Sequence, residues 1–243
     1  MKHGENSMTD EIDKPELLID ERDLGGIYES SRSLIISLVC SAFFLVLFAW
    51  LSEEVFEGAL QRFDLGVRMK VHESLGPDLT KFMLGMTFLG SIGFLTTLFA
   101  IIVAVWLAKG MKRPAVWLAI AVGGSVILDV SLKLSFHRTR PVPFVGVVPM
   151  TYSFPSGHAL SSFCFYGVLA GLLCARVRSR PIRFFIWAAS AALVFAIGLS
   201  RIYLGVHYPT DVIAGYIAAA AWVSTLLFAA RARRLAKSQS AKD

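Results

Sequence analysis

Residues 209–230 read PTDVIAGYIAAAAWVSTLLFAA, and Asp211 is the only charged residue in this stretch. A helix needs about 20 predominantly apolar residues to cross the hydrocarbon core of a bilayer, so the stretch predicts a transmembrane helix. Proline suits the first turn of a helix, which indicates that this one begins at Pro209. Hydrocarbon rather than water is therefore the expected surrounding of this part of the chain.

The same criterion selects five earlier stretches, and the expected fold is an all-α integral membrane protein with six transmembrane helices. The predicted spans are residues 33–51, 88–108, 115–134, 158–176, 183–199 and 209–230. Composition agrees, because 55% of the residues are hydrophobic and 17% are charged, which does not suit a soluble globular protein. The first apolar run starts too far into the chain and runs too long for a cleavable signal peptide, so we expect it to be retained.

Three segments make up the predicted domain organisation, and the sequence has no internal repeat. Residues 1–32 form a polar cytoplasmic segment, residues 33–230 the six-helix membrane domain, and residues 231–243 a basic cytoplasmic tail. After the first span, residues 55–75 mix apolar and charged side chains in a pattern typical of an amphipathic helix lying on the membrane interface. A solvated loop is the alternative for this segment.

The cations lie in short gaps between the apolar runs and set the expected orientation, because cytoplasmic loops carry an excess of Lys and Arg. They follow the second, fourth and sixth spans: Lys109, Lys112, Arg113, Arg176, Arg178, Arg180, Arg183, Arg231, Arg233, Arg234 and Lys237. Both termini are thus expected in the cytoplasm, with the loops after the first, third and fifth spans on the periplasmic or extracellular side. The net charge of +6 also raises nucleic acid as a partner, but cations confined to such gaps form no basic stripe, so nucleic acid is not expected.

KLSFHRTRP, residues 133–141, is the first of three clusters that carry chemistry. No acidic residue occurs between the end of the third span and the next cluster, so Lys133, Arg138 and Arg140 have no counter-ion nearby in the sequence. Arginine presents a planar fork that fits phosphate oxygens, so an anionic ligand is expected. Two alternatives stay open: the cations snorkel to the interface, or Asp129, one turn before Lys133, pairs with the lysine and holds it in place.

PSGH, residues 155–158, is the second cluster and opens the fourth span. Gly157 allows the backbone to approach a ligand closely, Ser156 offers a hydroxyl, and the amides of a helix N-terminus favour an anion. His158 would project from the first turn toward that anion. The same residues are also ordinary punctuation at the start of a helix, which is the alternative interpretation.

SRIYLGVHYPTD, residues 200–211, is the third cluster. If a helix begins at Pro209, Asp211 can reach back to one ring nitrogen of His207 and leave the other as a nucleophile, which is the orienting logic of a catalytic triad. A histidine and an aspartate that merely satisfy each other at a helix cap are the alternative. Arg201 stands close by, however, and an unpaired charge near hydrocarbon costs about 2.5 to 3.5 kcal/mol, so a group of such charges indicates a ligand.

Together the clusters resemble the type 2 phosphatidic acid phosphatase superfamily, which includes bacterial lipid phosphatases, glucose 6-phosphatase and the vanadium haloperoxidases. The family pattern is Lys-x6-Arg-Pro, then Pro-Ser-Gly-His, then Ser-Arg-x5-His-x3-Asp, and this chain meets it in order and spacing. The resemblance covers residues 88–230 with four of the spans, and the first span more loosely.

The resemblance implies roles for the matching residues. His207 would attack phosphorus in line, Asp211 would orient and charge-stabilise it, and His158 would protonate the leaving oxygen. The residues expected to hold the phosphoryl oxygens are Lys133, Arg140, Ser156, Gly157 and Arg201. This agrees with the chemistry of phosphoryl transfer, which needs positioning and cationic stabilisation of the equatorial oxygens.

Neither a metal nor another cofactor is expected. The family needs none, and one carboxylate among several cations is a poor cation site. A site built from two histidines and one carboxylate, namely His158, His207 and Asp211, is the alternative. The cysteines Cys40, Cys164 and Cys174 lie in apolar stretches without metal-ligand spacing, so we expect buried, inert thiols.

The predicted function is hydrolysis of a lipid phosphomonoester or diphosphate, of the undecaprenyl pyrophosphate, phosphatidylglycerol phosphate or phosphatidic acid class. The expected partners are the lipid phosphate and the bilayer of a bacterial inner membrane, with the active site at the outer face and its phosphohistidine on His207. Two other functions stay open: a non-catalytic lipid-phosphate translocator on the same scaffold, and a vanadate-dependent peroxidase, although the peroxidase relatives are soluble. The sequence predicts neither the exact substrate nor the oligomeric state.

Overall fold

The computed structural model describes residues 21–147 and 149–239, and over these ranges the chain is helical and contains no strand. Its α-helices are α1 (Glu21–Phe56), α2 (Gln61–Glu73), α3 (Pro77–Leu89), α4 (Ile92–Ala108), α5 (Lys112–Phe136), α6 (Gly157–Ser162), α7 (Val168–Cys174), α8 (Arg180–Tyr203) and α9 (Pro209–Gln239). A π-helical segment, η1 (Phe163–Gly167), joins α6 to α7. The all-helical class is thereby confirmed for the described residues.

Several of these helical stretches are long and apolar enough to cross a membrane. By length and hydropathy they are Ser31–Phe56, Lys112–Phe136, Gly157–Cys174, Arg180–Tyr203 and Pro209–Arg233, and α3 with α4 would add a sixth if that bent pair counts as one span. Most of them extend past the predicted boundaries, because a helix continues through polar flanking residues that hydropathy leaves out. At the two ends, α1 begins at Glu21, inside the predicted polar segment, while residues 1–20 and 240–243 lie outside the described part.

The second predicted span, residues 88–108, begins at the end of α3 and includes the bend that joins it to α4. α3 and α4 are bent by 49° at their junction. Ser91 caps α4, because its hydroxyl accepts a hydrogen bond from the Phe94 amide at 3.3 Å. Gly90 lets the corner press against α8, since a Cβ there would lie 2.4 Å from Ile197 Cγ2. Hydropathy misses this corner because both arms are apolar.

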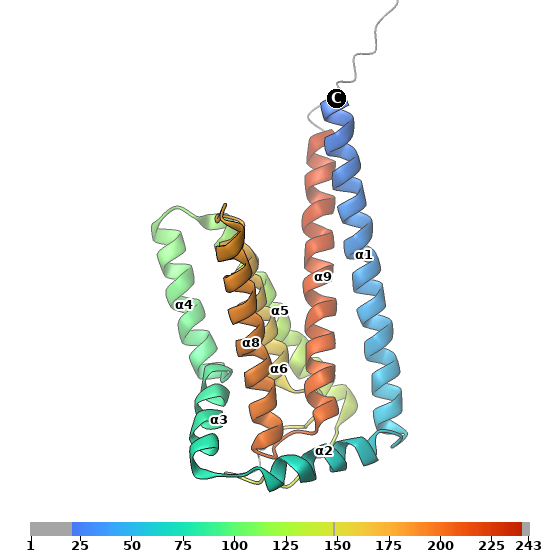
Figure 1. The fold of residues 1–243 in the computed structure, drawn as a ribbon. Coiled ribbons are helices and arrows are strands. Elements are labelled where there is room, and N and C mark those ends of the chain that lie inside the picture. The colour runs from blue at the N-terminus through green and yellow to red at the C-terminus, as the bar shows by residue number, and fades with distance from the viewer. Residues whose placement is uncertain (1–20, 148, 240–243) are drawn as a thin grey trace, which may run out of the picture.

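α1 and α9 run side by side and form one edge of the bundle (Figure 1). The Ser41 and Thr225 hydroxyls lie 2.7 Å apart across this pair. Nearer the chain ends, Arg231 Nη1 donates to the Ser33 carbonyl at 2.6 Å. These contacts hold α9 against α1. Asp211 of the third cluster lies in the first turn of α9, so the helix that carries it is anchored along its length.

The outer surface of the bundle is apolar and its interior contains polar groups. Exposed side chains include Ile35, Val46, Ile127 and Phe184. Fully buried ones include Asp64, Ser153, His207, Thr210 and Asp211. Exposed hydrophobic patches of this extent do not suit water but do suit a lipid surrounding.

The predicted amphipathic segment contains a helix, α2, which crosses one end of the bundle (Figure 1). Its buried positions are charged, unlike those of a helix on a water-soluble protein. Asp64 and Arg68 are its buried residues, whereas Phe63, Leu65 and Met69 are exposed. Two charged side chains of α2 therefore point into the protein, and its exposed side mixes these apolar residues with Arg62, Lys70 and Glu73.

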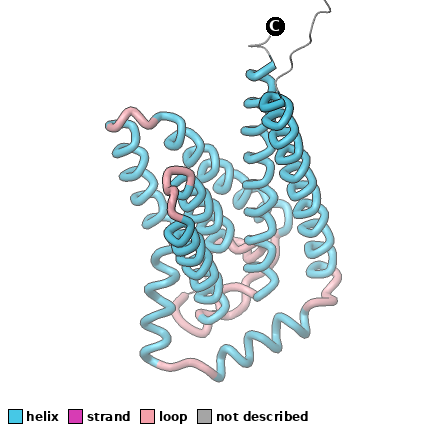
Figure 2. Tube along the Cα trace, turned by 45° about the horizontal axis from the view of Figure 1, so that its top comes forward, coloured by secondary structure: helices cyan, strands magenta, loops and turns pink. Residues whose placement is uncertain are grey.

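The gaps between the helices divide into two sets by position. The basic gaps between α4 and α5 and between α7 and α8 lie at the same end of the bundle as the end of α9 (Figure 1). The long loop, described over residues 137–147 and 149–156, lies at the opposite end, beside α2 and the turn before α9 (Figure 2). All three sequence clusters are thus brought toward this second end.

We predict that Gly124→Ala destabilises the protein while the matched change Gly123→Ala does not. A Cβ at Gly124 would lie 2.0 Å from Trp222 Cζ2 and push α5 away from α9, whereas a Cβ at Gly123 would meet nothing within 4 Å. Overpacking of this kind costs about 1 to 3 kcal/mol. Thermal unfolding in detergent should show a lower midpoint for Gly124→Ala alone, and equal midpoints for the two variants would contradict the packing described.

Candidate active site

His207 and Asp211 meet at the turn between α8 and α9. Gly205 makes this turn with φ of +75°, a conformation that suits glycine, and its bare Cα leaves room for the Phe144 backbone. Asp211 lies in the first turn of α9, four residues after the histidine, and its Oδ2 is 3.3 Å from His207 Nδ1. Both side chains are almost fully buried. The helix start at Pro209 and the expected reach of Asp211 are thus present in the structure.

The other ring nitrogen of His207 faces Arg140. Arg140 Nη1 lies 2.8 Å from His207 Nε2. A guanidinium has only donors, so Nε2 must be the acceptor and its lone pair is directed at Arg140. The ring proton therefore sits on Nδ1, toward Asp211, and this tautomer leaves Nε2 as the nucleophilic atom.

The pKa of His207 is lowered from 6.5 to about 4. Burial is the main cause, because it disfavours the charged imidazolium. The hydrogen bond and negative charge of Asp211 oppose the shift, while Arg140 and Arg201 add to it. At neutral pH the imidazole is therefore uncharged and able to act as a nucleophile.

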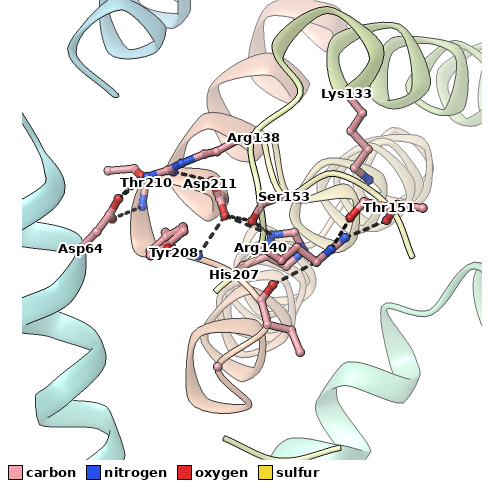
Figure 3. Close-up of polar contacts among 12 residues, drawn as sticks. Asp64, Lys133, Arg138, Arg140, Thr151, Ser153, His207, Tyr208, Thr210 and Asp211 are labelled. Atoms are coloured by element: carbon pink, nitrogen blue, oxygen red, sulfur yellow. Dashed lines mark hydrogen bonds and ion pairs between the residues drawn. The ribbon is translucent and has the colours of Figure 1, made fainter. Parts of the chain in front are cut away.

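The Asp211 carboxylate is held from several sides (Figure 3). Its Oδ1 accepts from Arg138 Nη1 at 2.6 Å. Its Oδ2 accepts from the Ser153 hydroxyl and, at 2.9 Å, from the Tyr208 amide. These donors replace the water that a buried carboxylate has lost, so Asp211 keeps a fixed position beneath the imidazole.

The Pro-Ser-Gly-His cluster packs directly on this pair. The Ser156 amide donates to the Asp211 carbonyl at 2.9 Å, and Ser156 Oγ is buried without a hydrogen-bond partner. A Cβ on Gly157 would lie 2.9 Å from Lys133 Nζ and from both carboxylate oxygens of Asp129. The start of α6 thus brings an unused hydroxyl and a bare Cα next to a lysine.

His158 follows in the first turn of α6 and is half-buried. Its Cδ2 lies 3.3 Å from the position of a Cβ on Gly90, so the bent α3–α4 corner packs on the ring. Its imidazole is close enough to interact electrostatically with His207, Arg201 and Lys133. The two histidines singled out from the sequence therefore belong to one cluster at one end of the bundle.

Cations from three elements surround these imidazoles. Arg201 on α8 is buried, donates from Nη1 to the Thr87 hydroxyl, and has an Nε without a partner. Arg140 donates from Nε to the Thr151 carbonyl at 2.6 Å and from Nη2 to the Thr151 hydroxyl at 2.9 Å. Lys133 Nζ contacts Asp129 Oδ2 at 2.8 Å, the pairing that the sequence left open.

Arg138 has no counter-ion nearby in the sequence, but the fold supplies two. Arg138 Nη1 lies 2.6 Å from Asp211 Oδ1, and Nη2 lies 2.8 Å from Asp64 Oδ2. Burial lowers the pKa of Arg138, but the two carboxylates outweigh it and the pKa is raised overall. Both partners are more than 70 residues away along the chain, so the local sequence could not reveal them.

Residues that the sequence analysis missed support the cluster from behind. They are Asp64, Thr87, Thr151 and Ser153. Ser153 stands two residues before the Pro-Ser-Gly-His cluster, and this proximity is the one feature of the sequence that could have indicated a role for Ser153. Asp64 and Arg68 are spaced four apart on α2, which places them on one helix face, but the pattern does not say that this face is the buried one.

The arrangement favours an anion over a metal ion. In the part of the chain that the structure describes, no group of three or more His, Cys, Asp or Glu side chains is placed to hold a metal, so His158, His207 and Asp211 do not form the alternative ligand set. What they form instead is a neutral imidazole backed by a carboxylate and faced by lysine and arginine side chains. Such a site can position and attack a tetrahedral anion.

Similarity to known proteins centres on this cluster. The family model described as PAP2 superfamily matches residues 114–234, which include every site residue predicted from the sequence. Phosphatidylglycerophosphatase B of Bacillus subtilis (strain 168) is 30% identical over 178 residues, which cover 72% of this chain and 84% of that protein. The chain belongs to the PAP2 superfamily. The resemblance inferred from the three clusters is confirmed.

Further PAP2 relatives extend the likeness to structure. The crystal structure of a transmembrane PAP2 type phosphatidylglycerolphosphate phosphatase from Bacillus subtilis matches with a TM-score of 0.69 at 27% identity, over 81% of this chain and 96% of that chain. Undecaprenyl-diphosphatase of Sulfolobus acidocaldarius is 30% identical over 124 residues, which cover 49% of this chain and 55% of that protein. The chain therefore has a PAP2 membrane phosphatase fold.

We predict that His207 stays neutral, with its proton on Nδ1, throughout the range above about pH 4. Nitrogen-15 NMR of histidine-labelled protein in detergent micelles should show an Nε2 that is unprotonated at pH 7, with His207→Gln used to assign the signal. As the pH falls toward 4, the ring should take up a proton and lose its nucleophilic lone pair. A signal that titrates near the ordinary value of 6.5 would contradict the buried environment described.

Proposed function

We propose that the chain is an integral membrane lipid phosphatase that hydrolyses a phosphomonoester or diphosphate of a lipid through a phosphohistidine on His207. One observation carries the proposal: a buried neutral imidazole presents Nε2 to Arg140 while Asp211 backs Nδ1. An imidazole held in this way is a nucleophile with its orienting carboxylate, and the facing guanidinium marks where a phosphoryl oxygen would bind.

The phosphoryl group would enter between Arg140 Nη1 and His207 Nε2. Lys133, Arg140 and Arg201 would then hold its equatorial oxygens. Ser156 Oγ and Arg201 Nε, both buried and unpartnered, are donors ready for the same oxygens. Gly157 would allow the phosphoryl group to come close to the start of α6, where the helix amides favour an anion.

Transfer would proceed in two balanced steps. In the first, His207 Nε2 attacks phosphorus, the bond to the leaving oxygen breaks, and protonated His158 gives that oxygen its proton; Asp211 stabilises the positive charge on the phosphorylated ring. In the second, His158 takes a proton from water, the resulting hydroxide attacks phosphorus, and the P–N bond breaks. The products are phosphate and a lipid alcohol, or a lipid monophosphate if the substrate is a diphosphate, and His207 returns to its neutral form.

A cavity of about 520 Å³ beside Lys133 supports a sideways approach of the substrate. Its lining residues are Asp129, Val130, Lys133, Leu134, Met150, Thr151 and Tyr152. Val130 and Leu134 are exposed on the apolar outer surface of α5, whereas Lys133 belongs to the cation cluster. A head group could therefore reach the histidines while its tails remain among apolar side chains.

No metal ion takes part in this proposed mechanism.

The substrate class follows from the relatives together with this geometry. The relatives named above act, by their names, on phosphatidylglycerol phosphate or undecaprenyl diphosphate. Both present a terminal phosphoryl group on a membrane-anchored lipid, as phosphatidic acid does. Any of the three fits a cluster that recognises phosphate and leaves the tail outside.

The membrane arrangement is proposed as six spans, with α3 and α4 counted as one. Residues 33–230 form the membrane phosphatase domain, flanked by a polar segment at residues 1–32 and a basic tail at residues 231–243. The protein would lie in a bacterial inner membrane with both termini in the cytoplasm, because the basic gaps gather at the end of the bundle away from the histidines. The site would then open to the outer leaflet, with the exposed mixed side of α2 on the interface.

We predict that His207→Gln abolishes phosphate release from lipid phosphates in detergent, since the nucleophile is lost. His72→Gln, at an exposed position on α2, is the matched control and should retain wild-type activity. Alkaline quenching of a reaction with phosphorus-32-labelled substrate should trap labelled protein in the wild type and in His158→Gln, but not in His207→Gln.

Two arms of the same assay separate the alternatives. A lipid translocator would tolerate His207→Gln and give no phosphate at all. Release should persist in excess chelator and stop with vanadate, which mimics the transition state. Loss of release in chelator would contradict the proposed mechanism and favour a metal-assisted one.

Sidedness has a separate test. A reporter fused after the last residue should be cytoplasmic, because the basic residues that follow the sixth span are expected to stay inside. Alkaline phosphatase and green fluorescent protein fusions, which are active on opposite sides of a bacterial inner membrane, provide the measurement. An active external reporter would overturn the proposed orientation.

A further inference from the structure

α2 contributes a buried carboxylate to the back of the active-site cluster. Asp64 is almost fully buried although it lies on a helix at the end of the bundle. Its Oδ1 accepts from the Thr210 amide at 3.0 Å, and its Oδ2 accepts from the Thr210 hydroxyl at 2.7 Å. Thr210 is the residue directly before Asp211, so Asp64 grips the start of α9 where the catalytic pair is formed.

Arg138 links this carboxylate to Asp211. Its Nη2 donates to Asp64 Oδ2 at 2.8 Å, while its Nη1 donates to Asp211 Oδ1 at 2.6 Å and to the Thr210 hydroxyl at 2.9 Å. The Tyr208 ring lies beneath the guanidinium at 4.3 Å. One guanidinium thus spans two carboxylates from different helices, as Figure 3 shows.

The charges of Asp64, Arg138 and Asp211 act on the His207 ring. If Asp211 were the sole partner of Arg138, the guanidinium would cancel most of the negative charge that supports a positive imidazole. Asp64 takes a share of that guanidinium, so the ion-paired set of two carboxylates and one arginine carries a net negative charge.

Other charged groups lie near the same ring, and most of them are cations that the net negative charge offsets. Arg68 on α2 interacts with Asp64, and Arg140 and Arg201 act on His207 from the opposite side. Arg140 and Arg201 are cations that disfavour positive charge on the histidine. A carboxylate that restores negative potential behind Asp211 therefore favours the phosphorylated ring.

We infer that Asp64 is a positioning residue which, through Arg138, fixes the Asp211 carboxylate and maintains the negative charge that His207 needs when its ring becomes positive. The inference rests on the proposed function. It also makes α2 part of the catalytic apparatus rather than a connecting segment, because the chain of contacts is complete only while α2 is docked.

Asp64→Asn tests the inference because the amide keeps the shape of the side chain and can still accept from the Thr210 backbone. Removing one negative charge should lower the pKa of His207, so the histidine NMR titration should shift to lower pH than in the wild type. For turnover, kcat for phosphate release should fall at least about tenfold with little change in KM, since the phosphate-binding side chains are untouched.

Three further variants separate the effect of charge from an effect on stability. Glu73→Gln removes the same charge from an exposed position on the same helix and should change neither the titration nor kcat. Asp64→Glu keeps the charge and should restore the titration of His207. Thr210→Val removes hydroxyl contacts to both Asp64 and Arg138 and should lower the unfolding temperature without the shift in titration.

The outcomes distinguish this inference from the proposed function. If wild-type protein released no phosphate, the proposed function would fail, yet the titration would still report whether Asp64 acts on His207. If phosphate release depended on His207 but Asp64→Asn titrated and turned over like Glu73→Gln, the inference alone would be overturned.

Discussion

The buried carboxylate of Asp211 is the constraint on which the arrangement of this end of the protein depends. It has lost its hydration, and a buried charge is tolerated only where donors replace the lost water. Those donors come from Ser153 and Arg138 in the loop before α6 and from the Tyr208 amide in the turn before α9. Because Arg138 also binds Asp64, α2 is drawn into the same contact set. Satisfying one ion thus fixes four parts of the chain relative to one another.

The membrane character of the bundle makes this constraint stringent. The outer surfaces of the helices are apolar, so the polar side chains of the chain are concentrated inside and at its ends. α2 follows the same logic, with Asp64 and Arg68 inward and Phe63, Leu65 and Met69 outward. A charged group that failed to find its partner here would face apolar side chains rather than water. The ion pairs of Asp64, Arg138 and Asp211 are therefore interlocked, whereas the exposed pair of Asp78 and Lys81 stands apart from them.

Local sequence was sufficient for the parts of the structure that depend on local physics. Apolar run length located most spans, and Pro209 correctly marked the start of α9. Spacing along one helix turn placed Asp211 next to His207. The 49° bend between α3 and α4 was not predicted, because both helices are apolar and hydropathy does not change at the bend. The ion pairs of Arg138 could not be predicted, because its partners Asp64 and Asp211 come from distant helices and only the tertiary fold brings them together.

The contact between Arg140 and His207 in the resting structure has one more consequence. The nitrogen that would react is not bare between turnovers, because a guanidinium already covers its lone pair. Under the proposed function, a phosphoryl group would have to take over the hydrogen bond of Arg140 before this nitrogen could react. Arg140 would thus have two roles: its guanidinium covers the lone pair of His207 in the resting site, and its positive charge recognises the phosphate of the substrate.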